Sequence, residues 1–143
     1  MFVGEYQHTI DEKRRMAIPA KFRPDLEGGA IITIGFDKSL VVYPLAQWQD
    51  ISKKYAELPL STAEARSFTR IMLAGAAQVE FDKLGRILIP DNLRKFAALG
   101  KDVTVIGLFN KIEIWDSSLW SEYKNKAQDG LNEMADKLKD LGI

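Results

Sequence analysis

Residues 11–19 read Asp-Glu-Lys-Arg-Arg-Met-Ala-Ile-Pro, and residues 82–90 read Asp-Lys-Leu-Gly-Arg-Ile-Leu-Ile-Pro. At an offset of 71 residues, an Asp, an Arg, an Ile and a Pro occupy the same places in both segments. Further downstream the offset becomes 72, and three more residues match: Ile34 with Ile106, Gly35 with Gly107, and Trp48 with Trp120. The chain is therefore one structural unit that occurs twice.

The sequence of each copy predicts the same order of short strands, turns and helices. A strand (residues 5–10 or 77–81) leads into an Asp-x-x-x-Arg turn, and a second strand follows the turn. Proline ends that second strand and suits the first position of a helix, so we expect short helices over residues 19–26 and 90–99. A hairpin comes next in each copy, and its strands are expected at 31–35 and 40–43, and at 103–108 and 112–115.

Three longer helices flank the two copies. The first is predicted over residues 45–58, between two prolines. The tetrapeptide Ser61-Thr62-Ala63-Glu64 fits a capping box and predicts a second helix to about Ala74. The last helix is predicted over residues 117–141, where apolar side chains alternate with many charges. It is amphipathic, so at least one face should lie against a partner surface.

The predicted fold class is α+β, with two β-rich repeats packed together. A unit of roughly 45 residues has little interior and is marginally stable alone, so we expect the two units to form one compact body. The first repeat is predicted at residues 1–75, with its core at about 5–48 and connecting helices after it. The second is predicted at residues 76–143, with its core at about 76–120 and a C-terminal helix.

Composition excludes several classes of function. The 143-residue chain is 46% hydrophobic and 28% charged, as is typical of a soluble globular protein, and no apolar run approaches a membrane span. It contains no cysteine and one histidine, so thiolate and histidine-based metal sites are not expected. Neither a Gly-x-Ser-x-Gly motif nor a phosphate-binding glycine loop occurs. We therefore predict no enzyme activity, metal, cofactor, small-molecule substrate or membrane partner, and a cytoplasmic location.

Basic side chains gather at the two turns, although the formal net charge of zero counts against nucleic-acid binding. The turns contain Lys13, Arg14 and Arg15 in the first copy, and Lys83 and Arg86 in the second. Three further basic residues follow on the short helices: Lys21, Arg23 and Arg94. The planar donor fork of arginine suits phosphate and guanine, and a two-stranded β-ribbon is narrow enough for the major groove. The charged turns are therefore candidate DNA contacts.

The same residues also have a purely structural interpretation. Asp11 with Arg15, and Asp82 with Arg86, could form surface ion pairs that fix their turns. Five basic residues could equally be solvated surface charge, which is usual for lysine and arginine: Lys13, Arg14, Lys21, Lys83 and Arg94. The two roles are compatible, because a carboxylate can hold a guanidinium where a phosphate or a base later meets it.

Two Asp-x-x-x-Arg turns, each followed by an apolar strand and a proline, resemble the MraZ family of bacterial transcriptional regulators. Three further segments resemble that family: Met1-Phe2-x-Gly4-Glu5, Ile18-Pro19-Ala20-Lys21-Phe22-Arg23 and Leu40-Val41-Val42-Tyr43-Pro44. The resemblance implies two SpoVT-AbrB-like modules, related to swapped-hairpin and double-ψ barrels and packed as a pseudo-dimer. It covers nearly the whole chain, and weakens only over about the last 20 residues.

The resemblance also implies a function. It implies a ring-shaped homo-oligomer, associated with the nucleoid, that binds direct DNA repeats upstream of the division and cell-wall gene cluster, with repression as the expected outcome. It places the DNA contacts on the turns Asp11–Arg15 and Asp82–Arg86. The chain departs from the family pattern at Arg14, where the second copy keeps Gly85. We therefore expect the two turns to contribute unequally.

A second hypothesis comes from another class of protein. The amphipathic C-terminal helix, from Trp120 onward, could dock on another protein. The chain would then be an oligomeric antitoxin-like or scaffolding module rather than a DNA-binding regulator.

Overall fold

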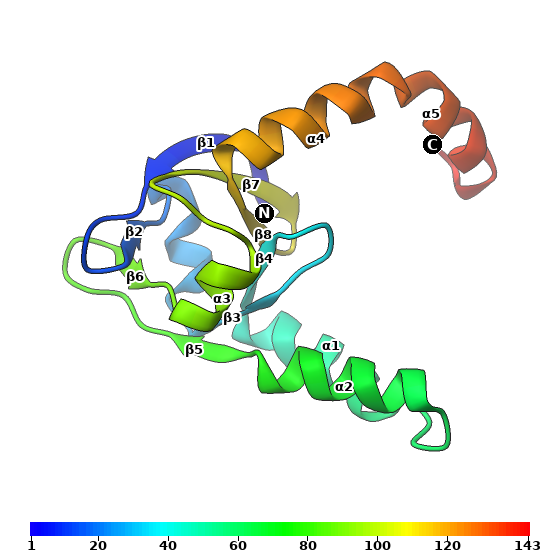
Figure 1. The fold of residues 1–143 in the computed structure, drawn as a ribbon, viewed down its shortest axis with the longest axis horizontal. Helices are drawn as coiled ribbons and strands as arrows, with labels where there is room; N and C mark the ends of the chain where they lie inside the picture. Colours follow the sequence, from blue (N-terminus) through cyan, green and yellow to red (C-terminus); the bar gives the residue numbers. More distant parts are fainter.

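The computed structural model describes residues 1–143 and contains a six-stranded antiparallel sheet, a two-stranded ribbon and five α-helices (Figure 1). The sheet consists of β1 (Phe2–Thr9), β3 (Ala30–Ile34), β4 (Leu40–Pro44), β5 (Ala77–Val79), β7 (Asp102–Phe109) and β8 (Ile112–Asp116). The ribbon consists of β2 (Arg15–Ala17) and β6 (Arg86–Leu88). None of the helices is both long enough and apolar enough to cross a membrane.

The helices lie outside the sheet. They are α1 (Leu45–Ala56), α2 (Ala63–Ala74), α3 (Asp91–Phe96), α4 (Ser117–Asp129) and α5 (Leu131–Leu138), with the 3-10 segments η1 (Ala20–Phe22), η2 (Pro24–Leu26) and η3 (Lys139–Leu141). Figure 1 shows two helical arms, α1–α2 and α4–α5, that project away from the sheet on the side opposite the turns before β2 and β6.

Each copy gives its first strand to the other copy. β1 of the first copy pairs with β7 of the second, and β5 of the second pairs with β3 of the first. The sheet order is β1-β7-β8-β4-β3-β5. Replacing each strand by its counterpart in the other copy gives the same order, counted from the other edge of the sheet. The predicted α+β fold of two repeats in one body is confirmed, whereas the division of the chain near residue 75 stays a prediction.

An approximate two-fold axis relates the copies. In the ribbon Met16 pairs with Ile87, its own counterpart at an offset of 71. Where β4 pairs with β8, Val41 pairs with Glu113, its own counterpart at an offset of 72. A residue that meets its counterpart must lie on the axis between the copies, so the axis passes through both pairs. The ribbon is therefore built equally from the two copies.

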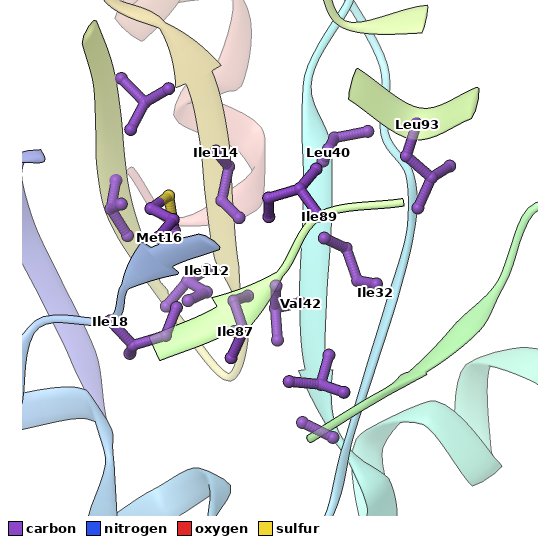
Figure 2. Close-up of a cluster of buried hydrophobic side chains, with 14 of the residues drawn as sticks. Met16, Ile18, Ile32, Leu40, Val42, Ile87, Ile89, Leu93, Ile112 and Ile114 are labelled. Atoms are coloured by element: carbon purple, nitrogen blue, oxygen red, sulfur yellow. The ribbon is translucent and has the colours of Figure 1, made fainter. Parts of the chain in front are cut away.

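One apolar core lies beneath the ribbon and is lined by both copies (Figure 2). Met16 and Ile87 point into it and are at most 1% exposed. Side chains alternate between the two faces of a strand, so the neighbours of these two residues point outward. Arg15 and Arg86 are thereby placed together on the outer face of the ribbon.

The strand register corrects the sequence alignment in one place. His8 of β1 pairs with Val103 of β7. Val79 of β5, the counterpart of His8 at an offset of 71, pairs with Ala30 of β3, so Val103 is the counterpart of Ala30. β7 therefore follows β3 at an offset of 73 rather than 72. Gly107 lies inside β7, whereas Gly35 lies in the turn after β3. The matching Ile-Gly dipeptides of the two copies are not structurally equivalent.

Gly107 is required where β1 pairs with β7. A Cβ atom at this position would lie 2.5 Å from backbone atoms of Phe2 and Val3. Gly107→Ala should therefore lower the free energy of unfolding by about 1–3 kcal/mol, because backbone atoms of a paired strand must move. Urea denaturation measures this loss. Gly28→Ala is the control, since its Cβ would meet nothing within 4 Å, and an equal effect of both variants would contradict the prediction.

The short helices differ from their predicted form. The segment after Pro19 is not one helix but the two 3-10 segments η1 and η2, because Pro24 has no N–H group with which to continue a helix. The segment after Pro90 is helical, but α3 ends at Phe96, and Ala98 has a left-handed conformation with φ of 50°.

Two expectations about the longer helices also need correction. The cap of α2 is Thr62 rather than Ser61, and its side-chain oxygen accepts a hydrogen bond from the N–H of Ala65 at 3.2 Å. The predicted C-terminal helix is broken at Gly130, because glycine has a low helix propensity. The base of α4 is attached to β1, since Trp120 donates a hydrogen bond to the carboxylate of Glu5.

Candidate functional site

The two Asp-x-x-x-Arg turns have the same hydrogen bonds between backbone and aspartate. Oδ1 of Asp11 accepts hydrogen bonds from the N–H groups of Lys13 and Arg15, at 2.8 and 3.0 Å. Oδ1 of Asp82 accepts the two equivalent bonds, both at 2.9 Å. Aspartate stabilises turns in this way by bonding to backbone groups that follow it. One carboxylate oxygen of each aspartate therefore shapes its own turn.

The first turn keeps this shape without a glycine. Arg14 has φ of 65°, close to the 75° of Gly85 at the equivalent position. A left-handed conformation costs an ordinary residue about 1–2 kcal/mol, and the exposed ion pair of the Arg14 side chain offsets at most part of this cost. That pair joins Arg14 Nη1 to Oδ1 of Asp91 at 2.7 Å. The extra charge of the first turn is thus matched by an aspartate of the other copy.

Each turn is also held by the opposite copy. The carbonyl of Arg14 accepts a hydrogen bond from the N–H of Ile89 at 2.9 Å. The carbonyl of Gly85 accepts the equivalent bond from Ile18 at 3.2 Å. The relative position of the two turns is consequently set by the backbone of the ribbon.

Four side chains form an ion cluster between the turns: Asp11, Arg15, Asp82 and Arg86. Each aspartate contacts both arginines. The closest contact is Arg86 Nε to Asp82 Oδ2 at 2.8 Å, and the other three N–O distances are 3.5, 3.6 and 3.9 Å. The arginine side chains are 31% and 29% exposed. Because a guanidinium has five N–H donors, these contacts leave donors that can face a ligand.

Hydrogen bonds from the turn backbone favour the ionised form of both aspartates and lower their pKa values. The N–H of Arg15 has the largest effect in lowering the pKa of Asp11 below its ordinary value. The N–H of Arg86 has the same effect on the pKa of Asp82, and its guanidinium adds to it. The cluster is therefore a set of two carboxylates and two guanidiniums at neutral pH.

These lowered pKa values predict acid sensitivity. A carboxyl group whose pKa is lower in the folded than in the unfolded protein stabilises the folded state at any pH above the unfolded pKa, which is near 3.8 for Asp82. This stabilisation is lost as the pH falls through the folded pKa. The free energy of unfolding should therefore fall as the pH is lowered from about 5 to about 2. In Asp82→Asn the fall should be smaller. Chemical denaturation at a series of pH values tests this, and identical pH profiles for the parent and the variant would contradict it.

The remaining predicted site residues fall into two groups. Lys13, Lys83 and Lys21 are exposed and take part in no ion pair. Arg23 and Arg94 are half-buried instead. Arg94 Nε lies 3.7 Å from Asp91, and Arg23 Nε donates a hydrogen bond to the carbonyl of Ile18 at 2.9 Å.

Asp91 is the site residue that sequence reasoning missed. It lies 77 residues from Arg14, and no spacing rule connects the two. An acidic residue in the first turn of a helix is explained by the helix dipole alone, so the pair with Arg14 leaves no signal in the sequence. The structure also contains no group of acidic, histidine or cysteine side chains that could hold a metal ion.

Comparison with known proteins gives one result for both copies. The family model described as "MraZ protein, putative antitoxin-like" matches residues 1–71 and residues 72–141. Three relatives, each named transcriptional regulator MraZ, align with this chain over the full length of both proteins. The identity is 47% with the protein of Halothermothrix orenii, 48% with that of a Thermoanaerobacter species, and 44% with that of Syntrophomonas wolfei.

Proposed function

Because the chain belongs to the MraZ family, we propose that it is a DNA-binding transcriptional regulator whose two Asp-x-x-x-Arg turns contact DNA. The observation that carries this proposal is the ion cluster, which brings Arg15 and Arg86 together, both partly exposed, on the outer face of the ribbon. The names of the relatives supply the regulatory role. The prediction that the chain is not an enzyme is confirmed by its membership of this family.

The cluster prepares two arginines for recognition. A hydrogen bond of 2.8 Å to Asp82 holds Arg86 in place, and contacts of 3.6 and 3.9 Å keep Arg15 beside the same two carboxylates. Less side-chain freedom is therefore lost when a ligand binds. A guanidinium presents two parallel N–H groups that match guanine O6 and N7, or two phosphate oxygens. The ribbon between the turns is narrow enough to approach the major groove. The structural and the DNA-binding roles of the aspartates are thus combined in one arrangement.

The lysines at the tips supply contacts of a different kind. Lys13 and Lys83 are exposed and unpaired, so we propose that they contact phosphates. Lys21, Arg23 and Arg94 are proposed as supporting phosphate contacts. Each turn, residues 11–15 and 82–86, has a net charge of +1 although the whole chain is neutral. Positive charge is therefore concentrated at the turns that are proposed to contact DNA.

The proposed targets are short direct repeats in the promoter of the division and cell-wall gene cluster, with repression as the outcome. A regulator of this kind would be cytoplasmic and bound to the nucleoid. The reading of successive repeats requires several copies of the turns in one assembly, because linked weak sites gain strongly in avidity.

We propose that this assembly is a ring-shaped homo-oligomer. The α4–α5 arm supports self-association, because it exposes large apolar side chains away from the core, among them Leu131, Leu138 and Leu141. Static light scattering should give a mass several times that of one chain. A mass equal to that of one chain at working concentration would contradict the proposal.

DNA binding tests the proposed function directly. The purified protein is titrated with the DNA upstream of its own operon and with unrelated DNA of equal length, at several salt concentrations. We expect preference for the upstream DNA, and an affinity that falls with salt by a log–log slope of roughly −0.9 per phosphate contact. Equal affinity for both DNAs, or binding that is insensitive to salt, would contradict the proposal.

A protein-interaction module is the second candidate function, and the exposed α4–α5 arm favours it. If this arm binds a partner other than the chain itself, affinity purification of the full-length protein should recover that partner in stoichiometric amounts. Recovery of such a partner, together with the absence of salt-sensitive DNA binding, would favour this candidate over the regulator.

A further inference from the structure

A cavity of about 410 Å³ lies beside the turn of the second copy. Three apolar side chains line it, from η2, from β5 and from the residue before Asp82: Leu26, Val79 and Phe81. Two cationic side chains, Arg23 and Lys83, line it as well, and Glu27 and Asp82 are the acidic ones. We call this cavity the second-turn pocket. Its volume lies within the range of small-molecule sites, roughly 300–1,000 Å³.

The cations of the pocket have no anionic partner in the protein. Arg23 uses its Nε–H for the carbonyl of Ile18 and takes part in no ion pair within 4.0 Å. Lys83 also takes part in none. The carboxylate of Asp82, by contrast, is occupied by Arg86 and by the backbone of the turn. The pocket therefore offers positive charge next to an apolar wall.

Gly85 is the reason that Arg23 can take this position. A Cβ atom at residue 85 would lie 2.4 Å from the guanidinium carbon of Arg23, so any side chain there would displace the guanidinium. The first copy shows the displaced arrangement. Arg14 replaces the glycine and pairs with Asp91, and Arg94, the counterpart of Arg23, lies near the same aspartate.

The rest of the pocket differs between the copies as well. Glu12 stands at the position equivalent to Lys83, and Ala97 at the position equivalent to Leu26. The first copy thus lacks both the second cation and part of the apolar wall. Although the backbone of the turns is the same, the features that suit a ligand occur only in the second copy.

We infer that the second-turn pocket binds a small organic anion, namely a carboxylate or phosphate group attached to an apolar body. The anionic group would pair with Arg23 and Lys83, and the apolar body would lie on Leu26, Val79 and Phe81. Charge-assisted hydrogen bonds to a guanidinium are strong enough to select an anion over a neutral molecule of the same shape.

Such a ligand would also influence DNA binding, and this part of the inference rests on the proposed function. Lys83 belongs to the proposed DNA contacts, and Asp82 orients Arg86. An anion bound to Lys83 neutralises one phosphate contact and adds negative charge beside the turn. We therefore expect the ligand to weaken DNA binding.

Titration of the full-length protein with two probes tests the pocket without DNA. The probes are benzoate and phenyl phosphate, and the controls are benzamide and inorganic phosphate, with binding followed by calorimetry and by the NMR signal of the Gly85 amide. We expect saturable binding of at least one probe, with a dissociation constant of roughly millimolar or tighter. Benzoate and phenyl phosphate distinguish a carboxylate ligand from a phosphate ligand. The absence of binding by both would overturn the inference, as would equally tight binding of benzamide or of inorganic phosphate.

Substitutions then locate the binding. Arg23→Gln and Lys83→Gln should each weaken probe binding about tenfold, as expected for a charge-assisted contact. Glu27→Gln is the matched control, because it removes a charge of opposite sign from the same pocket and should not weaken binding. The double variant Gly85→Arg with Ala20→Asp reproduces the arrangement of the first copy and should abolish binding. Lys83→Gln alters only an exposed side chain, so unchanged probe affinity in this variant would overturn the proposed pairing.

The influence on DNA is measured in a separate titration. Upstream DNA is added to the protein with and without a saturating concentration of the probe that binds, and the probe should weaken DNA binding several-fold. Equal DNA affinity in both titrations would overturn the link between the pocket and DNA. A failure of the proposed function is distinguishable, because DNA would then not bind even without the probe.

Discussion

Replacing Ile87 by Ala is expected to lower the free energy of unfolding by about 2–5 kcal/mol, which is the usual cost of an isoleucine truncated in a packed core. Ile87 is 1% exposed and pairs with Met16 on the axis between the two copies. A cavity at this position therefore removes contacts from both halves of the molecule. Urea denaturation followed by circular dichroism measures the change.

Leu88→Ala is the matched control for that variant. Leu88 follows Ile87 in β6 but points outward and is 59% exposed, so its truncation should change stability by less than about 0.5 kcal/mol. Because the copies exchange strands, Ile87→Ala should unfold in a single transition. Two separate transitions, or similar losses for Ile87→Ala and Leu88→Ala, would contradict the common core.

Replacing Arg86 by Ala is expected to weaken binding to the upstream DNA at least tenfold. An arginine that forms two hydrogen bonds to a base contributes about 1–3 kcal/mol, and an assembly that engages several turns at once multiplies the loss. Arg15→Ala should have an effect of the same kind. The affinity is measured at one fixed salt concentration, because salt alone changes it strongly.

The matched control for the arginine variants is Arg70→Ala. Arg70 is exposed on α2, in the helical arm that projects away from the turns. The Arg70→Ala substitution removes the same charge from the chain as Arg86→Ala, and it should leave the DNA affinity within about twofold of the parent value. Arg86→Lys separates charge from shape, since lysine keeps the charge but lacks the planar fork, and we expect it to lose sequence preference. Losses of equal size in Arg70→Ala and Arg86→Ala would show that only net charge matters.

The repeats and their turns could be predicted from the sequence because their signals are local. The aspartate, arginine and proline of each copy have fixed spacing, and each aspartate bonds to the backbone of its own turn. The partners of the strands could not be predicted in the same way. β1 has the same alternation whether it pairs with β3 or with β7, so the exchange of strands between copies leaves no local mark.

Two features of the site depended on contacts that the sequence does not encode locally. Arg14 pairs with Asp91 of the other copy, a contact between residues far apart in the sequence, and its turn has nearly the same backbone conformation as the turn at Gly85. Gly85 has the positive φ of a turn glycine, 75°, and its lack of a side chain also leaves room for Arg23. The break at Gly130, by contrast, had an available signal, because glycine inside a helical pattern lowers the expectation of a continuous helix.

Lysine modification with and without DNA tests the central claim most directly. Acetylation followed by mass spectrometry compares the two turn lysines with exposed lysines on the helical arms, such as Lys53 on α1 and Lys126 on α4, the latter with a side chain 80% exposed. If the turns contact DNA, upstream DNA should slow the modification of Lys13 and Lys83 and leave the arm lysines unchanged. Protection of the arm lysines, with Lys13 and Lys83 modified at the same rate in both samples, would contradict the account.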